Sequence, residues 1–196
     1  MRMSGLIVVV AWLVMFASAE ANEAVYRATP VGVIEVKDIP SVKAMTASAE
    51  GPYFDQYDKA FWKLARYLRR HDVKMSVPVE AYTDERSEMR FLLGSRDIAR
   101  DLPSADGVSI TTRPPHTVVS IGLKGAYRQS LYEQGVTKLR EWLKGNPEWV
   151  EAGAPYKAYW DGPFVPMFMK RSEVHIPVQP AERGAARPAA PKEPSS

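Results

Sequence analysis

Apolar residues recur at helical spacing in two segments of the chain, one in each half. In both segments the apolar positions follow an i, i+4, i+7, i+11 pattern, which places them on one face of a helix. Arg69 and Arg70 follow the first segment, where cations suit a helix end, and Gly145 and Pro147 follow the second. The pattern predicts two amphipathic helices, with apolar stripes formed by Tyr57, Phe61, Leu64 and Leu68 and by Tyr132, Val136, Leu139 and Leu143.

Short apolar or alternating segments predict strands before and after each helix. Residues 31–36 and 42–47 flank a turn at Pro40, and residues 108–112 and 117–123 flank a turn at Pro115, so each pair is predicted to form a hairpin. Further strands are predicted at residues 75–82, 89–93 and 173–178.

The two halves of the chain are similar when they are aligned with an offset of 75 residues. This offset superposes identical residues at Lys63 and Lys138, at Leu64 and Leu139, and at Leu68 and Leu143, and it also aligns the turn prolines. A chance likeness of two amphipathic helices is the alternative. The repeat predicts an α+β fold of two pseudo-symmetric strand-helix-strand units, forming a curved antiparallel sheet or distorted β-barrel with two main helices.

The first residues have the form of a secretory signal peptide. Arg2 gives a positive start, residues 6–16 are apolar, and the small residues that end at Ala19 form a cleavage site, with an alternative cut after Ala21. A retained anchor is the other interpretation, but the apolar run is shorter than the roughly 20 residues that span a bilayer. We expect residues 1–19 to be removed, without stable membrane insertion afterwards, and the protein to be periplasmic or secreted.

The other end of the chain is rich in Pro, Ala, Gly and Ser. Residues 179–196 are therefore predicted to be a disordered tail, which leaves residues 22–178 as a single domain. The whole chain carries a net charge of +3, and much of that excess lies in the two ends. The domain itself is close to neutral, so no nucleic-acid partner is expected.

The composition and the missing motifs exclude several kinds of chemistry for this chain. The chain has no cysteine, which excludes disulfides, thiolate metal sites and haem thioether attachment. The sequence also contains no HExxH, no phosphate-binding glycine loop and no GxSxG motif. Glu35 and Glu80 in predicted strands are the candidates for the glutamate of a hydrolase. We expect a protein that is not an enzyme.

Three segments, taken in order, resemble the SOUL haem-binding family. Residues 33–38 (VIEVKD) are similar to its opening strand, and residues 74–79 (KMSVPV) to its KM-T-x-PV strand. Residues 158–164 (AYWDGPF) followed by residues 171–174 (RSEV) are similar to its closing segment. The matches span residues 31–178, and the duplicated unit agrees with the two-fold architecture of the family.

The resemblance implies non-covalent binding of haem or another tetrapyrrole in a hydrophobic surface cleft. The family site lies between the first helix and the loop before the last strand, so the protein would be a carrier, buffer or scavenger. A module that binds another hydrophobic small molecule, or a partner protein without an iron ligand, is the alternative.

The first helix carries an aromatic residue among cations outside its apolar stripe. Trp62 lies at helical spacing from Lys59 and Arg66 and next to Lys63. An aromatic ring can stack on a flat macrocycle while the cations meet its propionates. A half-buried tryptophan beside solvated cations is the alternative interpretation.

The loop before the last strand is unusually apolar for a connection. If the loop is exposed, it would form a binding patch. If it packs on the barrel, it would be a lid that binds no ligand. Its candidate ligand-binding residues are Tyr159, Trp160, Phe164, Met167 and Lys170.

Iron ligation has weak candidates in this sequence. At the position of the histidine proposed as axial ligand in one branch of the family, this chain has Asp38. His71 is interpreted as a helix-end cation and His116 as an exposed turn residue. His175 is the candidate metal ligand, although its alternation with Val174 predicts that it faces solvent. The metal ligand is left unassigned.

Overall fold

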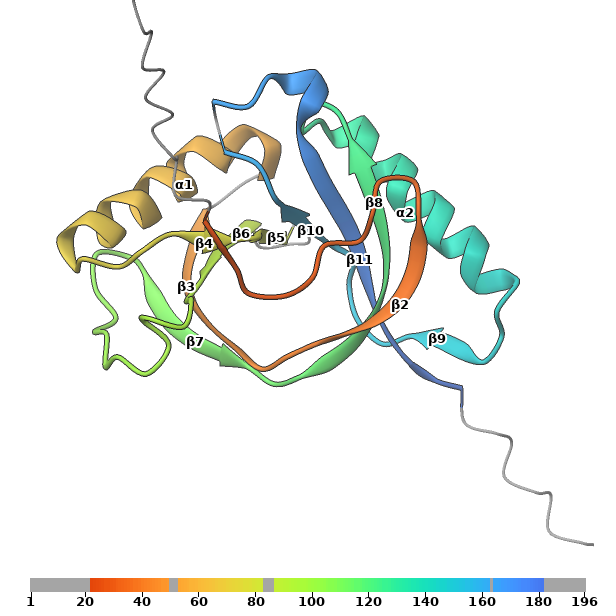
Figure 1. Cartoon of the computed structure of the whole chain (residues 1–196), viewed down its shortest axis with the longest axis horizontal. Helices are drawn as coiled ribbons and strands as arrows, with labels where there is room; N and C mark the ends of the chain where they lie inside the picture. The colour runs from red at the N-terminus through yellow and green to blue at the C-terminus, as the bar shows by residue number, and fades with distance from the viewer. Residues whose placement is uncertain (1–21, 50–52, 83–86, 163, 182–196) are drawn as a thin grey trace, which may run out of the picture.

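The computed structural model describes residues 22–49, 53–82, 87–162 and 164–181 (Figure 1). Two helices, α1 (Tyr53–Arg70) and α2 (Gln129–Lys144), pack on a large curled antiparallel sheet, which confirms the predicted α+β class. The strands of the first half are β1 (Glu23–Ala24), β2 (Ile34–Ile39), β3 (Val42–Ala49), β4 (Ser76–Val77), β5 (Val79–Tyr82) and β6 (Ser87–Leu92). Those of the second half are β7 (Ser109–Arg113), β8 (His116–Lys124), β9 (Trp149–Glu151), β10 (Tyr156–Tyr159) and β11 (Arg171–Pro180), with a short 3₁₀ helix η1 (Met167–Met169) before β11.

The order of the strands in the sheet is symmetric about its centre. The order is β2-β8-β11-β10-β5-β6-β3-β7, and β9 pairs with the end of β11. Exchanging β2 with β7, β8 with β3, β11 with β6 and β10 with β5 reverses the order and reproduces it, with β5 and β10 paired at the centre. Gly32 and Gly107 are related by the offset of 75 residues, and both adopt left-handed φ angles, of 81° and 74°. The repeat predicted from the sequence is therefore structural.

The two predicted hairpins are wrong. β2 does not pair with β3 but with β8, and β7 pairs with β3, so each half lends its first strand to the other half. The connecting residues explain the difference, because Pro40 and Pro115 lie in them and two-residue hairpin turns require positive φ angles that proline cannot adopt. The chain instead passes from one end of the curled sheet to the other.

The core consists of three clusters. α1 covers one half of the sheet, where Leu64 and Tyr67 pack on Phe91, and α2 covers the other half, where Leu139 packs on Ile176. Both predicted apolar stripes thus face the sheet as expected, apart from Tyr57, whose side chain lies outside the described residues. The third cluster fills the inside of the curl and contains Tyr26, Ile39, Val42, Ala44, Leu92, Val118, Tyr156 and Trp160.

The amino-terminal segment, residues 22–33, closes the inside of the curl. β1 pairs in parallel with β4, and the segment then crosses the opening, as the red trace in Figure 1 shows. Its Tyr26 is buried in the inner cluster. At Gly122 a Cβ atom would lie 2.2 Å from the carbonyl oxygen of Pro30, so only glycine permits this crossing.

The described residues end shortly after the last strand. β11 continues through Pro180, two residues beyond the predicted end of the domain, because Gln179 and Pro180 pair with β9. The predicted signal peptide, and the tail from residue 182, lie outside the described residues. Within the described ranges no helix is long and apolar enough to span a membrane.

Candidate functional site

The outer face of α1 carries the predicted aromatic and cationic residues together. Lys59, Trp62, Lys63 and Arg66 are all exposed, and their spacing places them on neighbouring turns. Trp62 is 60% exposed, with its ring edge-on to Phe61 at 5.5 Å between centroids. Lys63 reaches back to the carbonyl oxygen of Ser48 at 3.5 Å. The structure thus assembles a cationic helix face around an accessible indole.

The loop after β10 divides into a buried part and an exposed part. Tyr159 and Trp160 are only 4% and 8% exposed, and they pack in the α1 cluster and the inner cluster respectively. The part after Asp161 is open, with Phe164 98%, Met167 63% and Phe168 74% exposed. The first two residues are therefore packed on the barrel, and the described residues after Asp161 include large apolar side chains open to solvent.

The base of this loop is fixed. The Asp161 carboxylate accepts a hydrogen bond of 2.6 Å from the backbone N–H of Arg171 and pairs with the Arg171 guanidinium at 2.8 Å. Burial alone raises the pKa of Asp161, but these bonds from Arg171 lower it below its ordinary value. The Lys170 ammonium lies 4.9 Å from the centre of the Tyr127 ring. The exposed apolar residues are thus carried between two anchored ends.

The buried side of α1 and the base of the loop pack in the same part of the core. Tyr159 lies in one cluster with Ala60 and Leu64 of α1. In Figure 1 the loop, drawn in blue, rises at the end of the molecule where α1 and α2 begin. We call the exposed residues of the two elements the α1–loop surface; it comprises Lys59, Trp62, Lys63, Arg66, Phe164, Met167, Phe168, Met169 and Lys170.

Inside the curl, Glu173 is the centre of a buried polar network. Its carboxylate accepts bonds from Lys37 Nζ at 2.6 Å, from Ser120 Oγ at 2.9 Å and from the backbone N–H of Thr29 at 2.7 Å. His175 Nε2 lies 2.6 Å from the same carboxylate. Burial alone raises the pKa of Glu173, yet the His175 and Lys37 contacts lower it to about 2. The network ties β2, β8 and β11 to the amino-terminal segment.

A second buried glutamate, Glu80, is enclosed by an arginine and two tyrosines. Arg113 forms bonds of 2.8 Å and 2.7 Å to the two carboxylate oxygens, and the Tyr26 hydroxyl donates to one of them at 3.0 Å. Tyr82 lies 3.4 Å from the other oxygen. Glu80 is fully buried and Glu35 pairs with Arg27 at 2.6 Å. Both hydrolase candidates are thus engaged in ion pairs, which gives neither the character of an accessible base.

His175 and His116 are placed differently from the predictions, whereas His71 follows the end of α1 as expected. His175 is fully buried rather than solvent-facing, because α2 covers one face of β11 and the amino-terminal segment covers the other. His116 is half-buried, with Nε2 at 3.1 Å from the Tyr156 hydroxyl. His71 stacks on Tyr67 at 4.2 Å between ring centres. Asp38 accepts a bond of 2.7 Å from Thr117.

Among the described residues, the α1–loop surface carries no histidine that could ligate a haem iron. His175 lies behind Tyr26 and Tyr156 inside the curl, where a macrocycle has no room. No group of three or more His, Asp or Glu side chains in the described residues could hold a free metal ion. The donors that do reach the α1–loop surface are the thioethers of Met167 and Met169.

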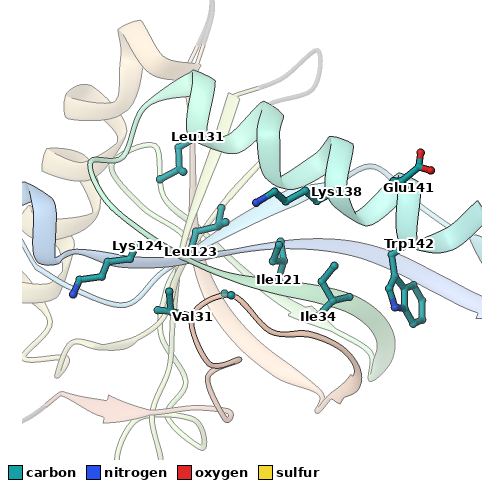
Figure 2. Close-up of a pocket in the computed structure, with 11 residues that line it drawn as sticks. Val31, Ile34, Ile121, Leu123, Lys124, Leu131, Lys138, Glu141 and Trp142 are labelled. Atoms are coloured by element: carbon teal, nitrogen blue, oxygen red, sulfur yellow. The ribbon is translucent and has the colours of Figure 1, made fainter. Parts of the chain in front are cut away.

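A separate groove lies between α2 and the edge strand β2 (Figure 2). Its volume is ≈ 570 Å³. Apolar side chains of Ile121 and Leu123 on β8 form its floor, and Lys138 and Trp142 of α2 border it. Sequence reasoning did not find this groove, because its lining combines residues of β2, β8 and α2 that are far apart in the sequence.

Lys157 on β10 is a buried cation under the start of α2. Its ammonium lies 4.6 Å from the centre of the Tyr132 ring, and 5.9 Å from that of Tyr159. Burial lowers its pKa from 10.5 to about 7, against a smaller opposing effect of Glu133. The protonated form of Lys157 is thus destabilised in the folded state.

Comparison with protein families gives one match that spans most of the chain. The family model described as SOUL heme-binding protein matches residues 22–177. No curated protein sequence matches the chain.

Solved structures share the fold at low sequence identity. The C-terminal domain of EcmrR has a TM-score of 0.63 and 16% identity, with 76% of this chain and 98% of that domain covered. The EcmrR chain in a complex with DNA has a TM-score of 0.60 at 16% identity, and only 58% of that chain is covered. A protein described as a hydrolase from Listeria innocua has a TM-score of 0.55 and 13% identity, with 77% of this chain and 94% of that one covered. At these identities the likeness concerns the fold alone.

Proposed function

Because the chain belongs to the SOUL heme-binding protein family, we propose that it binds haem or another tetrapyrrole non-covalently at the α1–loop surface. The observation that carries this proposal is the exposure of Phe164, Met167 and Phe168 on a loop whose base is fixed. Contiguous exposed apolar residues on a folded domain mark a binding surface.

The chemistry of the surface suits a flat anionic ring. Trp62 and Phe168 offer aromatic faces for stacking, and apolar burial of the ring would supply most of the binding free energy. Lys59, Lys63 and Arg66 are placed to meet propionate groups. Haem, when bound, supplies a redox-active iron, while the residues of this chain bind and orient the ring and exclude water from one face.

The role that fits such binding is that of a carrier, buffer or scavenger outside the cytoplasm. This part of the proposal depends on the signal peptide predicted for residues 1–19. Fractionation of cells that express the full chain, followed by mass determination of its amino terminus, tests both the compartment and the cut after residue 19 or 21.

A hemin titration tests the proposed ligand directly. The chain from residue 22 is titrated with hemin, and the Soret band is recorded against hemin alone. We expect a saturable change of band position and intensity at one equivalent. A spectrum equal to the sum of free hemin and protein would reject the proposal. A different pigment or lipid retained on purification, identified by mass spectrometry, would favour the alternative hydrophobic ligand.

Two substitutions locate the site, and a third serves as control. Trp62→Ala and Arg66→Ala are expected to weaken hemin binding roughly 5–20-fold while Tm changes by less than about 2 °C, because both side chains are exposed. Arg140→Ala on α2 removes an equally exposed cation outside the surface, and its affinity should equal that of the unmodified protein. Equal affinities in all three variants would place the ligand elsewhere.

A further inference from the structure

The groove under α2 differs from the equivalent place under α1 at its rim and not at its floor. Ile121 and Leu123 of the floor face α2, and Met45 and Ala47 on β3 are buried under α1 in the same way. At the rim, the offset of 75 residues relates Val31 to Asp106. The segment that forms the rim is therefore what distinguishes the two halves.

The first copy of the groove is closed by its own chain. The segment before β7 packs against α1, where Leu102 and Val108 are buried beside Tyr67. The equivalent segment before β2 turns into the curl instead, where Tyr26 joins the inner cluster. Val33, the counterpart of Val108, is consequently 42% exposed, and Val31 is 50% exposed. The open groove thus keeps apolar residues in contact with solvent.

The charged residues of the lining and the length of the groove indicate what kind of ligand would fill it. Figure 2 shows Lys124 and Leu131 towards one end, the Lys138 side chain directed towards them, and Trp142 at the opposite end. The lining residues of α2 run from Leu131 to Trp142, a distance of about 16 Å at 1.5 Å per residue. Glu141 also lines the groove, beside Trp142, and its carboxylate pairs with Lys144 at 2.9 Å, so the cations and the carboxylate lie towards opposite ends of an apolar floor.

We propose that this groove binds a linear amphiphilic carboxylate of the fatty-acid type. The carboxylate lies between Lys124 and Lys138, and the acyl chain runs along Ile121 and Ile34 towards Trp142. Two lysines at one end complement a single anionic head, and the apolar floor requires no polar partner from the remainder of the ligand. This site differs in position and in ligand class from the α1–loop surface.

Sodium laurate, below its micellar concentration, is the probe. Isothermal titration of the chain from residue 22 should show one saturable site, and laurate labelled with ¹³C at its carboxyl group should show a chemical-shift change that saturates at one equivalent. Dodecanol, which has the same chain without the charge, should bind at least about 5-fold more weakly. Absence of saturable laurate binding, or equal binding of dodecanol, would overturn the inference.

Three variants test the position. Lys138→Gln and Lys124→Gln should each weaken laurate binding roughly 3–10-fold, because each removes one charge from the head-group end. Arg140→Gln, on the same helix but outside the lining, is the charge-matched control and should leave laurate affinity unchanged. Val31→Glu places a carboxylate at an exposed rim position, where folding is not at risk, and should abolish binding. Laurate affinity that is the same in all variants would reject this location.

Hemin titrations keep this inference separate from the proposed function. Val31→Glu should bind hemin as the unmodified protein does, and Trp62→Ala should bind laurate unchanged. If Val31→Glu loses hemin binding, the groove is the tetrapyrrole site and the fatty-acid assignment is overturned. If laurate binds as expected while hemin does not bind at all, the groove assignment stands and only the proposed function fails.

Discussion

At the residue scale, the buried carboxylates inside the curl decide how the protein responds to acid. Glu173 is 1% exposed and is ionised against its burial because Lys37, Ser120 and the Thr29 backbone all donate to it. A buried charge of this kind stabilises only together with its partners, and the loss of one partner leaves the other uncompensated.

Glu173 makes the folded state sensitive to acid. Its pKa falls from 4.5 to about 2 on folding, so its contribution is complete above pH 4.5 and is lost as pH falls towards 2. We expect the free energy of unfolding to drop by about 2–3 kcal/mol over this window. Urea unfolding of the unmodified protein and of Glu173→Gln at pH 6, 4 and 2.5 measures this drop, which should be smaller in the variant. An equal acid dependence in both would contradict the assignment.

Lys157 makes a second prediction, in a higher pH range. Burial lowers its pKa from 10.5 to about 7, so the unfolded chain binds more protons between these values and stability rises with pH. We expect a gain of about 1–3 kcal/mol between pH 7 and pH 9 that Lys157→Met lacks. Urea unfolding at pH 6, 7.5 and 9 measures it. A variant that retains the full rise would show that another group is responsible.

The alternation of residues in a strand predicted the face of His175 correctly but not its environment. It lies opposite Val174 and Ile176 as the pattern requires, yet a segment far away in the sequence covers that face. Local periodicity describes which side chains share a face, whereas the partner of that face depends on tertiary contacts.

At the element scale, α2 approaches β11 closely because of Gly135. A Cβ atom at this position would lie 2.6 Å from Val174 Cγ2 and 3.1 Å from Leu123 Cδ1. Val174 is a β-branched residue that cannot move aside by a rotamer change. The helix is therefore set at a distance from the sheet that only glycine allows.

Gly135→Ala should destabilise the protein in spite of the better helix propensity of alanine. Overpacking costs about 1–3 kcal/mol, against a gain of up to about 1 kcal/mol for replacing glycine in a helix. We expect Gly135→Ala to lower Tm in the unmodified protein. In a protein that already carries Val174→Ala, the same substitution should lower Tm by less. Differential scanning calorimetry of the three variants gives the coupling. Strict additivity of the two substitutions would contradict a direct contact.

The helices were predictable and the strand pairing was not, for one physical reason. Helical hydrogen bonds are local, so Leu64 and Leu139 carry the helical period in the sequence itself. Strand partners are chosen across the whole chain, and the prolines at residues 40 and 115 indicated only that a turn was present. The pairing of β2 with β8 follows from the repeat as a whole, which local turn patterns do not describe.

At the scale of the whole molecule, the exchange of β2 and β7 makes each half incomplete by itself. β2 pairs only with the second half and β7 only with the first. The chain divided after residue 105 should therefore give two fragments that do not fold separately but assemble when mixed. Circular dichroism and size-exclusion chromatography of residues 22–105, of residues 106–181 and of their mixture measure this. Cooperative unfolding of either fragment alone would contradict the prediction.

One candidate site could be predicted from local sequence, and the other depends on the tertiary structure. The α1–loop surface was predictable because Trp62 and its neighbouring cations follow one another on a single helix. The groove under α2 combines residues of β2, β8 and α2, whose proximity depends on the exchange of strands between the halves. Its lining could be read from the sequence only once the repeat was aligned and the fold known.

The position of β11 has a consequence for biosynthesis. It is the last strand of the described chain, yet it lies between β8, which pairs with residues 171–177, and β10, which pairs with residues 172–175. During synthesis the amino-terminal end of the chain is made first. The edge of β8 that pairs with β11 therefore stays without a hydrogen-bonding partner strand until β11 has been made. Such an edge can recruit other chains. Nascent molecules should thus need a holding chaperone up to the moment of release, and premature termination before residue 171 should yield aggregates rather than partly folded monomers.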